Sequence, residues 1–168
     1  MTNTNTAQLS QALSPEVLKK IDIWIAKYPA EQRQSAVIPA LHIAQEAYDG
    51  SLTTELMDAI ANYLGMPNIS VYEVATFYSM FELKPVGKNK ISVCTNISCM
   101  LRGSEDIVAH LKTKLGVGLG ETTEDGKFTL KEVECLGACG GAPMMELHKK
   151  YYENLTPAKL DEILDAIK

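Results

Sequence analysis

The cysteines are the residues of this chain whose types and spacing most clearly suggest chemistry. All four lie in two short motifs, Cys94–Cys99 and Cys135–Cys139, which read C-x4-C and C-x3-C. Both spacings are wider than the C-x2-C of a zinc knuckle or of a thioredoxin redox site. Four thiolates that arrive as two pairs suit a 2Fe–2S cluster, which takes two protein ligands on each iron. We therefore expect one such cluster, with the cysteines as its metal ligands: Cys94, Cys99, Cys135 and Cys139.

Glycines accompany the second motif, and each motif is expected to form a loop of small and polar residues after a β-strand. Glycine lets a backbone N–H group approach a sulfur atom closely, and such hydrogen bonds hold and tune an iron–sulfur cluster. We predict that Gly137 or Gly140 adopts a positive φ or directs its N–H onto a sulfur.

Other uses of four cysteines stay open at this point. Disulfides are disfavoured, because no secretory signal precedes the motifs and a reducing compartment is then expected. Zinc also accepts four thiolates, and would make the chain a zinc-stabilised interaction domain without redox chemistry. Free core thiols explain poorly why all four cysteines lie in two short motifs. A thiol oxidoreductase is disfavoured because the C-x2-C motif is missing.

Other residues that commonly carry chemistry offer no second site. His42, His110 and His148 are scattered and pair with neither cysteine motif, so we expect ordinary core or surface roles. The stretch Gly116–Gly120 looks like a nucleotide-binding loop, but its third glycine comes one residue early and it follows a predicted helix instead of a strand. We identify no catalytic residues and expect no nucleotide site on this chain.

The N-terminal half is predicted to supply only helices. Ser14 and Pro15 open the first helix, which is expected to end at Pro29. Apolar residues at helical spacing predict helices from about residue 35 and over about 53–64, and a Ser-x-x-Glu capping box predicts a fourth from Ser70. Together they favour a small bundle over residues 14–83. An aromatic run is expected to pack mainly in its core, with a docking face for a partner as the second interpretation: Tyr72, Phe77, Tyr78 and Phe81.

The pattern changes after a polar linker that contains proline and glycine, residues 84–89. Alternating apolar residues predict a strand that ends at Cys94, a helix over about 104–115, and hairpin strands joined at Asp125-Gly126 that lead to the second motif. Further strands and a closing helix follow. The bond before Pro143 is expected to be trans, because only about 5% of X–Pro bonds in folded proteins are cis.

Composition and charge exclude other classes of protein. The chain has 168 residues, 46% hydrophobic and 22% charged, which is ordinary globular composition. A formal net charge of −5 argues against nucleic-acid binding. No apolar run approaches the about 20 residues that a membrane-spanning helix needs. Residues 1–13 are polar and contain no basic residue, so we expect a disordered tail on a cytosolic protein.

Several segments together resemble a known family. They are Val74–Ser79, Cys94–Cys99, Asp125–Phe128, and Glu134–Cys139 followed by Ala142–Met145. Over nearly its whole length the chain is similar to the thioredoxin-like 2Fe–2S subunits of the NADH-oxidising module of respiratory complex I, the NADH-quinone oxidoreductase. Equivalent subunits of NAD-linked hydrogenases and formate dehydrogenases look similar, and they stand as the alternative parent complexes.

The resemblance implies an α+β fold, with a small N-terminal helical bundle followed over residues 90–168 by a thioredoxin-like α/β domain that carries the 2Fe–2S cluster. In such domains the proline at the position of Pro143 is often cis. The resemblance also implies a function: an electron-transfer subunit that exchanges single electrons with the FMN of a partner flavoprotein, on which NADH binds. The chain would then be a subunit of NADH dehydrogenase (quinone), peripheral on the cytoplasmic face of the inner membrane and not itself inserted.

Overall fold

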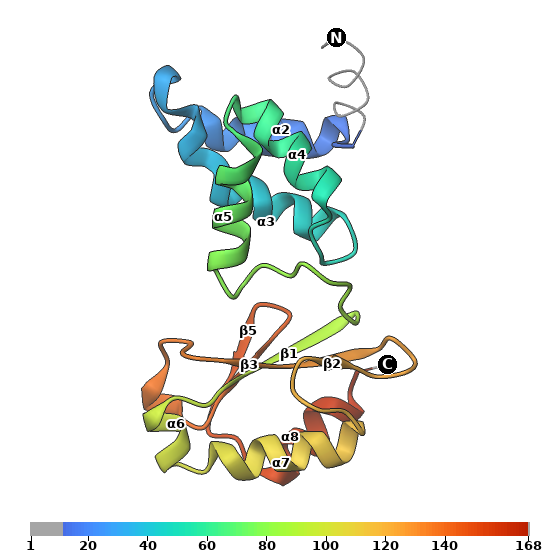
Figure 1. Ribbon diagram of the computed structural model, residues 1–168. Coiled ribbons are helices and arrows are strands. Elements are labelled where there is room, and N and C mark those ends of the chain that lie inside the picture. The colour runs from blue at the N-terminus through green and yellow to red at the C-terminus, as the bar shows by residue number, and fades with distance from the viewer. Residues whose placement is uncertain (1–11, 168) are drawn as a thin grey trace. The chain divides into compact units, whose positions relative to one another are not determined.

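The structure is a computed structural model that describes residues 12–167 (Figure 1). These residues form two compact units, divided between Pro85 and Val86. The predicted linker, residues 84–89, spans this division. Most of the predicted tail, residues 1–13, lies outside the described residues. Its last residue, Leu13, is only 4% exposed and packs in the core of the first unit, so the folded part begins before Ser14.

The first unit consists of helices joined by short connections. Their bounds are α2 Pro15–Ile25, the 3₁₀ helix η1 Ala30–Ala36, α3 Val37–Ala47, α4 Thr54–Leu64 and α5 Asn68–Phe77. The local signals act as predicted at two of these helices. The Ser14 side chain accepts a hydrogen bond from the Val17 N–H at the start of α2. Gly65 ends α4 in the left-handed conformation, with φ +71°.

Two helix bounds in this unit differ from the prediction, and one short helix was not predicted. Helix α2 ends at Ile25, before Pro29, and the stretch after it forms the 3₁₀ helix η1. Helix α5 starts at Asn68, directly after Pro67, so Ser70 lies inside its first turn and does not cap it. Proline restricts the residue before it and suits the entry to a helix, and this signal outweighed the capping box.

The core of the first unit gathers apolar side chains from all four α-helices. The aromatic run begins within α5 and divides between core and surface. The prediction that these aromatic residues pack mainly in the core did not foresee this division. Phe81 is 5% exposed, whereas Phe77 is 79% exposed and packs edge-to-face on Tyr78 at 5.0 Å between ring centroids. Gln45 holds the segment after α5, because its side chain donates to Met80 O and accepts from Glu82 N.

The second unit is a five-stranded sheet with helices on one face. Its elements are β1 Asn89–Cys94, α6 Ile97–Leu101, α7 Ser104–Leu115, β2 Glu121–Thr122, β3 Phe128–Val133, η2 Cys139–Gly141, β4 Met145–Leu147, β5 Lys150–Tyr152 and α8 Pro157–Asp165. The strand order is β2-β3-β1-β4-β5. Strand β1 runs parallel to β3 and antiparallel to β4. Helices α7 and α8 lie together below the sheet in Figure 1, and their apolar residues share its core.

The central strand explains how this unit positions the cysteines. Residues Ile91 and Val93 of β1 point into the main core and are completely buried. Because successive side chains of a strand alternate between faces, the Cys94 side chain points to the opposite face of the sheet, away from this core. None of the helices over residues 12–167 has the length and apolarity that a bilayer crossing requires.

Candidate metal centre

The end of β1 lies against both ends of the second cysteine loop. On one side Cys94 pairs with Val133, and the Thr95 N–H donates to Val133 O at 3.3 Å. On the other side the Cys94 N–H donates to Met144 O at 3.2 Å. The Cys94 Sγ is 3.8 Å from Glu134 O, to which its thiol donates. The sheet therefore places the two cysteine motifs next to each other, although they are far apart in sequence.

Cys99 lies in the short helix α6 and not in an open loop, which corrects the prediction for the first motif. Asn96 caps this helix, since its side-chain oxygen accepts from the Ile97 N–H at 2.7 Å. Asn96 is a favourable N-cap residue, but a helix of only five residues has no apolar periodicity, so the sequence did not predict it. The helix turns Cys99 inward, so its side chain is 1% exposed, and Cys94 is similarly buried at 4%.

The pKa of the Cys99 thiol is raised to about 11, chiefly by burial, and in addition by a hydrogen bond with Cys94 and by electrostatic interaction with Cys94 and Cys139. A hydrogen bond from the backbone at Met144 opposes this shift. Three of the four predicted ligands therefore lie in one neighbourhood, and Cys94 and Cys99 belong to the same buried cluster.

The second loop exposes its cysteines to solvent, and both Cys135 and Cys139 are free thiols. Gly137 has φ +71°, and its N–H donates to the Cys135 Sγ at 3.3 Å. The prediction for the two glycines is thus confirmed through Gly137. Gly140 does not have a positive φ, and a Cβ placed there would meet no atom within 4 Å.

A strap of residues 153–155 holds the far end of the second loop. The Asn154 N–H donates to Gly141 O at 2.6 Å, and the Leu155 N–H donates to Pro143 O at 3.0 Å. The Glu153 side chain fills the space beside Gly141. A Cβ added at Gly141 would lie only 2.4 Å from the Glu153 Cδ. The Ala142–Pro143 bond is cis, which corrects the trans expectation from sequence frequencies and agrees with what the resemblance implied.

The four cysteines fit a binuclear iron–sulfur group in their chemistry. All are free, each half of the set comes from one motif, and one sulfur already accepts a backbone N–H. Among residues 12–167 no three Cys, His, Asp or Glu side chains are arranged to hold a single metal ion. A 2Fe–2S cluster has its ligands divided over two irons, so its thiolates need not converge on one point.

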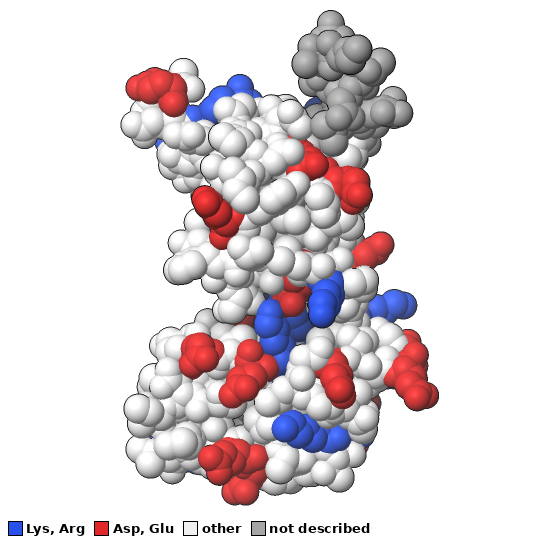
Figure 2. All heavy atoms as spheres, in the orientation of Figure 1, with Lys and Arg blue, Asp and Glu red and all other residues white. Residues whose placement is uncertain are grey.

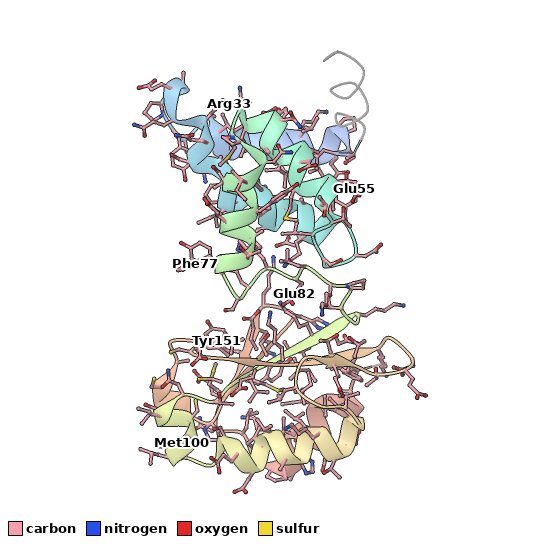
Figure 3. The ribbon with its side chains drawn as sticks, viewed as in Figure 1. Arg33, Glu55, Phe77, Glu82, Met100 and Tyr151 are labelled. Atoms are coloured by element: carbon pink, nitrogen blue, oxygen red, sulfur yellow. The ribbon has the colours of Figure 1, made fainter. Side chains whose placement is uncertain are left out.

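The surface beside the buried pair is apolar. Helix α6 exposes three large side chains: Ile97 at 66%, Met100 at 44% and Leu101 at 76%. Met100 of α6 and Tyr151 of β5 are labelled in Figure 3, and Tyr151 is 48% exposed. Figure 2 shows acidic side chains spread over the surface of both units, in keeping with the negative net charge.

The histidines have partners away from the cysteines, as the sequence led us to expect. Nε2 of His110 is 2.9 Å from Oδ1 of Asp161, and Nε2 of His148 is 2.7 Å from Oδ1 of Asn89. The ring of His42 packs against that of Phe81. The glycine-rich stretch that looked like a nucleotide loop begins with Gly116, which ends α7 in the left-handed conformation. It therefore follows a helix, as predicted.

Comparison with protein families gives one match that covers most of the chain. A family model described as "Thioredoxin-like [2Fe-2S] ferredoxin" matches residues 21–168.

Curated relatives match over similar lengths. A protein of Rickettsia bellii (strain RML369-C), named as a subunit of NADH-quinone oxidoreductase, is 45% identical over 168 residues, which cover 100% of this chain and 96% of that protein. The protein of the same name from Rickettsia conorii is 52% identical over 143 residues, 85% of this chain and 86% of that protein. NADH dehydrogenase [ubiquinone] flavoprotein 2, mitochondrial, of Dictyostelium discoideum is 46% identical, over 99% of this chain and 68% of that protein.

Among solved structures, the crystal structure of an NAD⁺-reducing [NiFe]-hydrogenase in the air-oxidized state matches with a TM-score of 0.67 and 20% identity. The match covers 78% of this chain but only 22% of that chain. At this identity the likeness concerns the fold alone.

Proposed function

Because the chain belongs to the thioredoxin-like [2Fe-2S] ferredoxin family, we propose that it is the electron-transfer subunit of an NADH:quinone oxidoreductase. In this proposal Cys94, Cys99, Cys135 and Cys139 hold one 2Fe–2S cluster. The observation that carries it is the placement of Cys94 between the two ends of the second cysteine loop, where the Cys94 N–H donates to Met144 O and the neighbouring Thr95 N–H donates to Val133 O.

When bound, a 2Fe–2S cluster accepts and returns one electron at a time. The chain's own residues set the conditions for this exchange. The Gly137 N–H at the Cys135 sulfur stabilises negative charge there, and therefore favours the reduced state. The buried pair, Cys94 and Cys99, keeps water from one side of the centre, while the exposed pair leaves the other side open.

The partner that we propose is a flavoprotein that binds FMN and NADH. A hydride carries two electrons, and splitting them into single electrons is the chemistry of a flavin. No nucleotide-binding pattern was identified in the sequence of this chain. The two Rickettsia relatives are by their names parts of a larger complex. We place this chain at the cytoplasmic face of the inner membrane, held there by the complex.

Two exposed apolar surfaces are available for such an assembly. One is the outer side of α6, beside the buried cysteines, with Ile97 and Leu101. The other is the pair Phe77 and Tyr78 at the end of α5 in the first unit. Aromatic residues and methionine are enriched in the cores of protein interfaces.

The alternative parent complexes are an NAD-linked hydrogenase and a formate dehydrogenase. The curated relatives reported above carry NADH-quinone oxidoreductase or NADH dehydrogenase names over 85% to 100% of this chain, whereas the hydrogenase likeness is one of fold. Zinc stabilisation, the alternative from another class, predicts a colourless protein.

The experiment that tests the function uses the full chain, purified anaerobically. NADH is added first to the chain alone and then together with the flavoprotein subunit, and the cluster is followed by EPR at cryogenic temperature. We expect a reduced-cluster signal only when both proteins are present. Dithionite serves as the positive control, since it needs no flavin. A signal from NADH with the single chain would refute the proposal, because it would require a nucleotide site on this chain.

A further inference from the structure

The side chain of Glu153 runs along the backbone of Gly141, the last residue of the 3₁₀ helix η2 that begins with Cys139. A Cβ added at Gly141 would lie 2.5 Å from the Glu153 Cβ, 2.6 Å from its Cγ and 2.4 Å from its Cδ, so the stem and the carboxyl carbon both pack there. Gly141 itself is buried. The absence of a side chain at residue 141 therefore makes room for a carboxylate beside the second cysteine loop.

The strap fixes this position through its backbone. The Asn154 N–H donates to Gly141 O, and the Leu155 N–H donates to Pro143 O. Asn154 has φ 49°, a left-handed conformation that asparagine tolerates better than most residues. Leu155 is 4% exposed and packs in the core of the second unit. The backbone of Glu153 is thus held against the second cysteine loop by the two residues that follow it.

The charge of the Glu153 carboxylate is not neutralised by a direct ion pair. The Lys159 ammonium donates to the backbone oxygen of Glu153 and not to its carboxylate. Over residues 12–167, no lysine, arginine or histidine nitrogen lies in ion-pair contact with that carboxylate. The loop therefore has a full negative charge beside it.

Covalent geometry limits how far this charge can lie from a predicted ligand. Gly141 follows Cys139 by two residues, so their Cα atoms are at most about 7.6 Å apart. The Cα–Cβ bond and the 2.4 Å gap beyond it then place the Glu153 carboxyl carbon no more than about 12 Å from the Cys139 Cα. Over such a distance the interaction of two unit charges changes an equilibrium constant about twofold to tenfold, depending on how much water lies between them.

We infer that the negative charge of Glu153 lowers the reduction potential of the metal centre that the two cysteine motifs form. The inference rests on the proposed function, because it needs a 2Fe–2S cluster at this site. Reduction adds one electron to the centre, and a fixed negative charge nearby opposes this addition. Glu153 thus acts against the Gly137 N–H, which favours the reduced state from within the same loop.

The test compares Glu153→Gln with Glu124→Gln in the full, cluster-loaded chain at low salt. Both substitutions remove one negative charge and keep the shape of an exposed side chain. Glu124 lies in the β2–β3 hairpin, whose Gly126 O accepts from the Lys88 N–H at the start of β1, about 20 Å of strand from Cys94. In an EPR-monitored redox titration we expect Glu153→Gln to raise the reduced-to-oxidised ratio at fixed potential about twofold to tenfold. Glu124→Gln should change the ratio much less.

Two further measurements separate the charge from a packing role. Glu153→Asp keeps the charge but shortens the side chain that packs on Gly141, so its potential should stay near that of the wild type. A packing role predicts the reverse, with the aspartate variant perturbed and the glutamine variant normal. The Debye length falls from about 30 Å at 0.01 M salt to about 3 Å at 1 M, so the difference between the wild type and Glu153→Gln should shrink as salt is added.

Iron and labile sulfide are measured in each sample, so that the two proposals can fail separately. A wild-type chain without a cluster would overturn the proposed function and this inference with it. At full cluster content, an unchanged potential in Glu153→Gln, or an equal rise in Glu124→Gln, would overturn this inference alone. A rise in Glu153→Gln that persists undiminished at high salt would also overturn it, because the rise would then come from altered packing and not from the charge.

Discussion

The backbone N–H of Gly137 points at the sulfur of Cys135, two residues earlier, at 3.3 Å. The loop can make this hydrogen bond because Gly137 has φ +71°, a conformation that other residues adopt only with strain. The second cysteine loop is therefore shaped by one residue whose lack of a side chain is essential.

Replacing Gly137 with alanine should disturb the centre without unfolding the protein. A Cβ in the left-handed conformation costs about 1–2 kcal/mol, and relief of this strain rotates the N–H away from the sulfur. We expect lower cluster occupancy or a lower reduction potential, measured by labile-sulfide content and redox titration, with unchanged helical content by circular dichroism. Gly140→Ala is the control, because Gly140 has space around it and no positive φ. Wild-type spectra and potential in both variants would contradict the role of Gly137.

Replacing Gly141 with alanine should act differently, through a clash with Glu153. The new Cβ would lie 2.5 Å from the Glu153 Cβ, which cannot move without the strap. Overpacking of this kind costs about 1–3 kcal/mol, so we expect a lower denaturation midpoint and reduced cluster content. Adding Glu153→Gly to Gly141→Ala should recover much of the loss, and a double-mutant cycle measures the coupling. Purely additive effects would show that the two residues do not clash.

The four-cysteine ligand set predicts a defined metal content. Anaerobically purified protein should contain iron and acid-labile sulfide in equal amounts, about two of each per chain. Replacement of any one of the four cysteines by alanine should abolish or strongly reduce both. Stoichiometric zinc without labile sulfide would instead establish the zinc-stabilised domain.

The cluster-free thiols should differ in reactivity by pair. Cys135 and Cys139 are exposed, whereas Cys94 and Cys99 are buried. The pKa of Cys99 is raised from 9.0 to about 11, so its thiol stays neutral to a higher pH than that of an ordinary cysteine. Alkylation followed by mass spectrometry should modify the exposed pair first, and Cys99 only as the pH approaches about 11.

The raised pKa of Cys99 also predicts how the stability of the cluster-free chain changes with pH. A raised pKa in the folded state stabilises the cluster-free chain below pH 9, and this contribution is lost as the pH rises through the folded value. Equal modification rates for all four thiols at neutral pH would contradict the burial of the first pair.

Loss of the cluster should weaken the second unit more than the first. The two units have separate cores. The core of the first unit lies among its helices, and that of the second lies between the sheet and helices α7 and α8. Bonds from ligands to metal stabilise the part of the chain that holds them. In a Cys139→Ala variant, amide exchange should therefore increase mainly after Lys90. An equal increase over residues 15–81 would mean that the units unfold as one.

Local signals in the sequence predicted most elements because each signal acts within a few residues. The Ser14 cap, the Gly65 helix end and the Asp125-Gly126 turn are of this kind. The bounds of α5 were wrong because two local signals, Pro67 and the Ser70 capping box, competed at its start. Helix α6 was missed because one turn of helix has no periodicity to detect.

The ligand candidates could be predicted because cysteine is rare and its spacing is informative. The features that hold them could not, since they depend on contacts between distant segments. Nothing in the sequence around Glu153 indicates that its side chain lies over Gly141. Likewise the burial of Ser104 depends on the direction in which α7 crosses the sheet, which spacing along the helix does not reveal.

The position of β1 between β3 and β4 has a consequence for the order of assembly. Cys94 comes near the second loop only after β1 has paired with two strands that lie far along the chain. Closing such long loops is entropically costly and makes sheet formation slow compared with local helix formation. In the unfolded chain the two cysteine pairs are therefore separate and cannot act together. The chain is expected to fold first and to receive a preassembled cluster afterwards, unlike a zinc finger, in which closely spaced ligands allow the metal to drive folding.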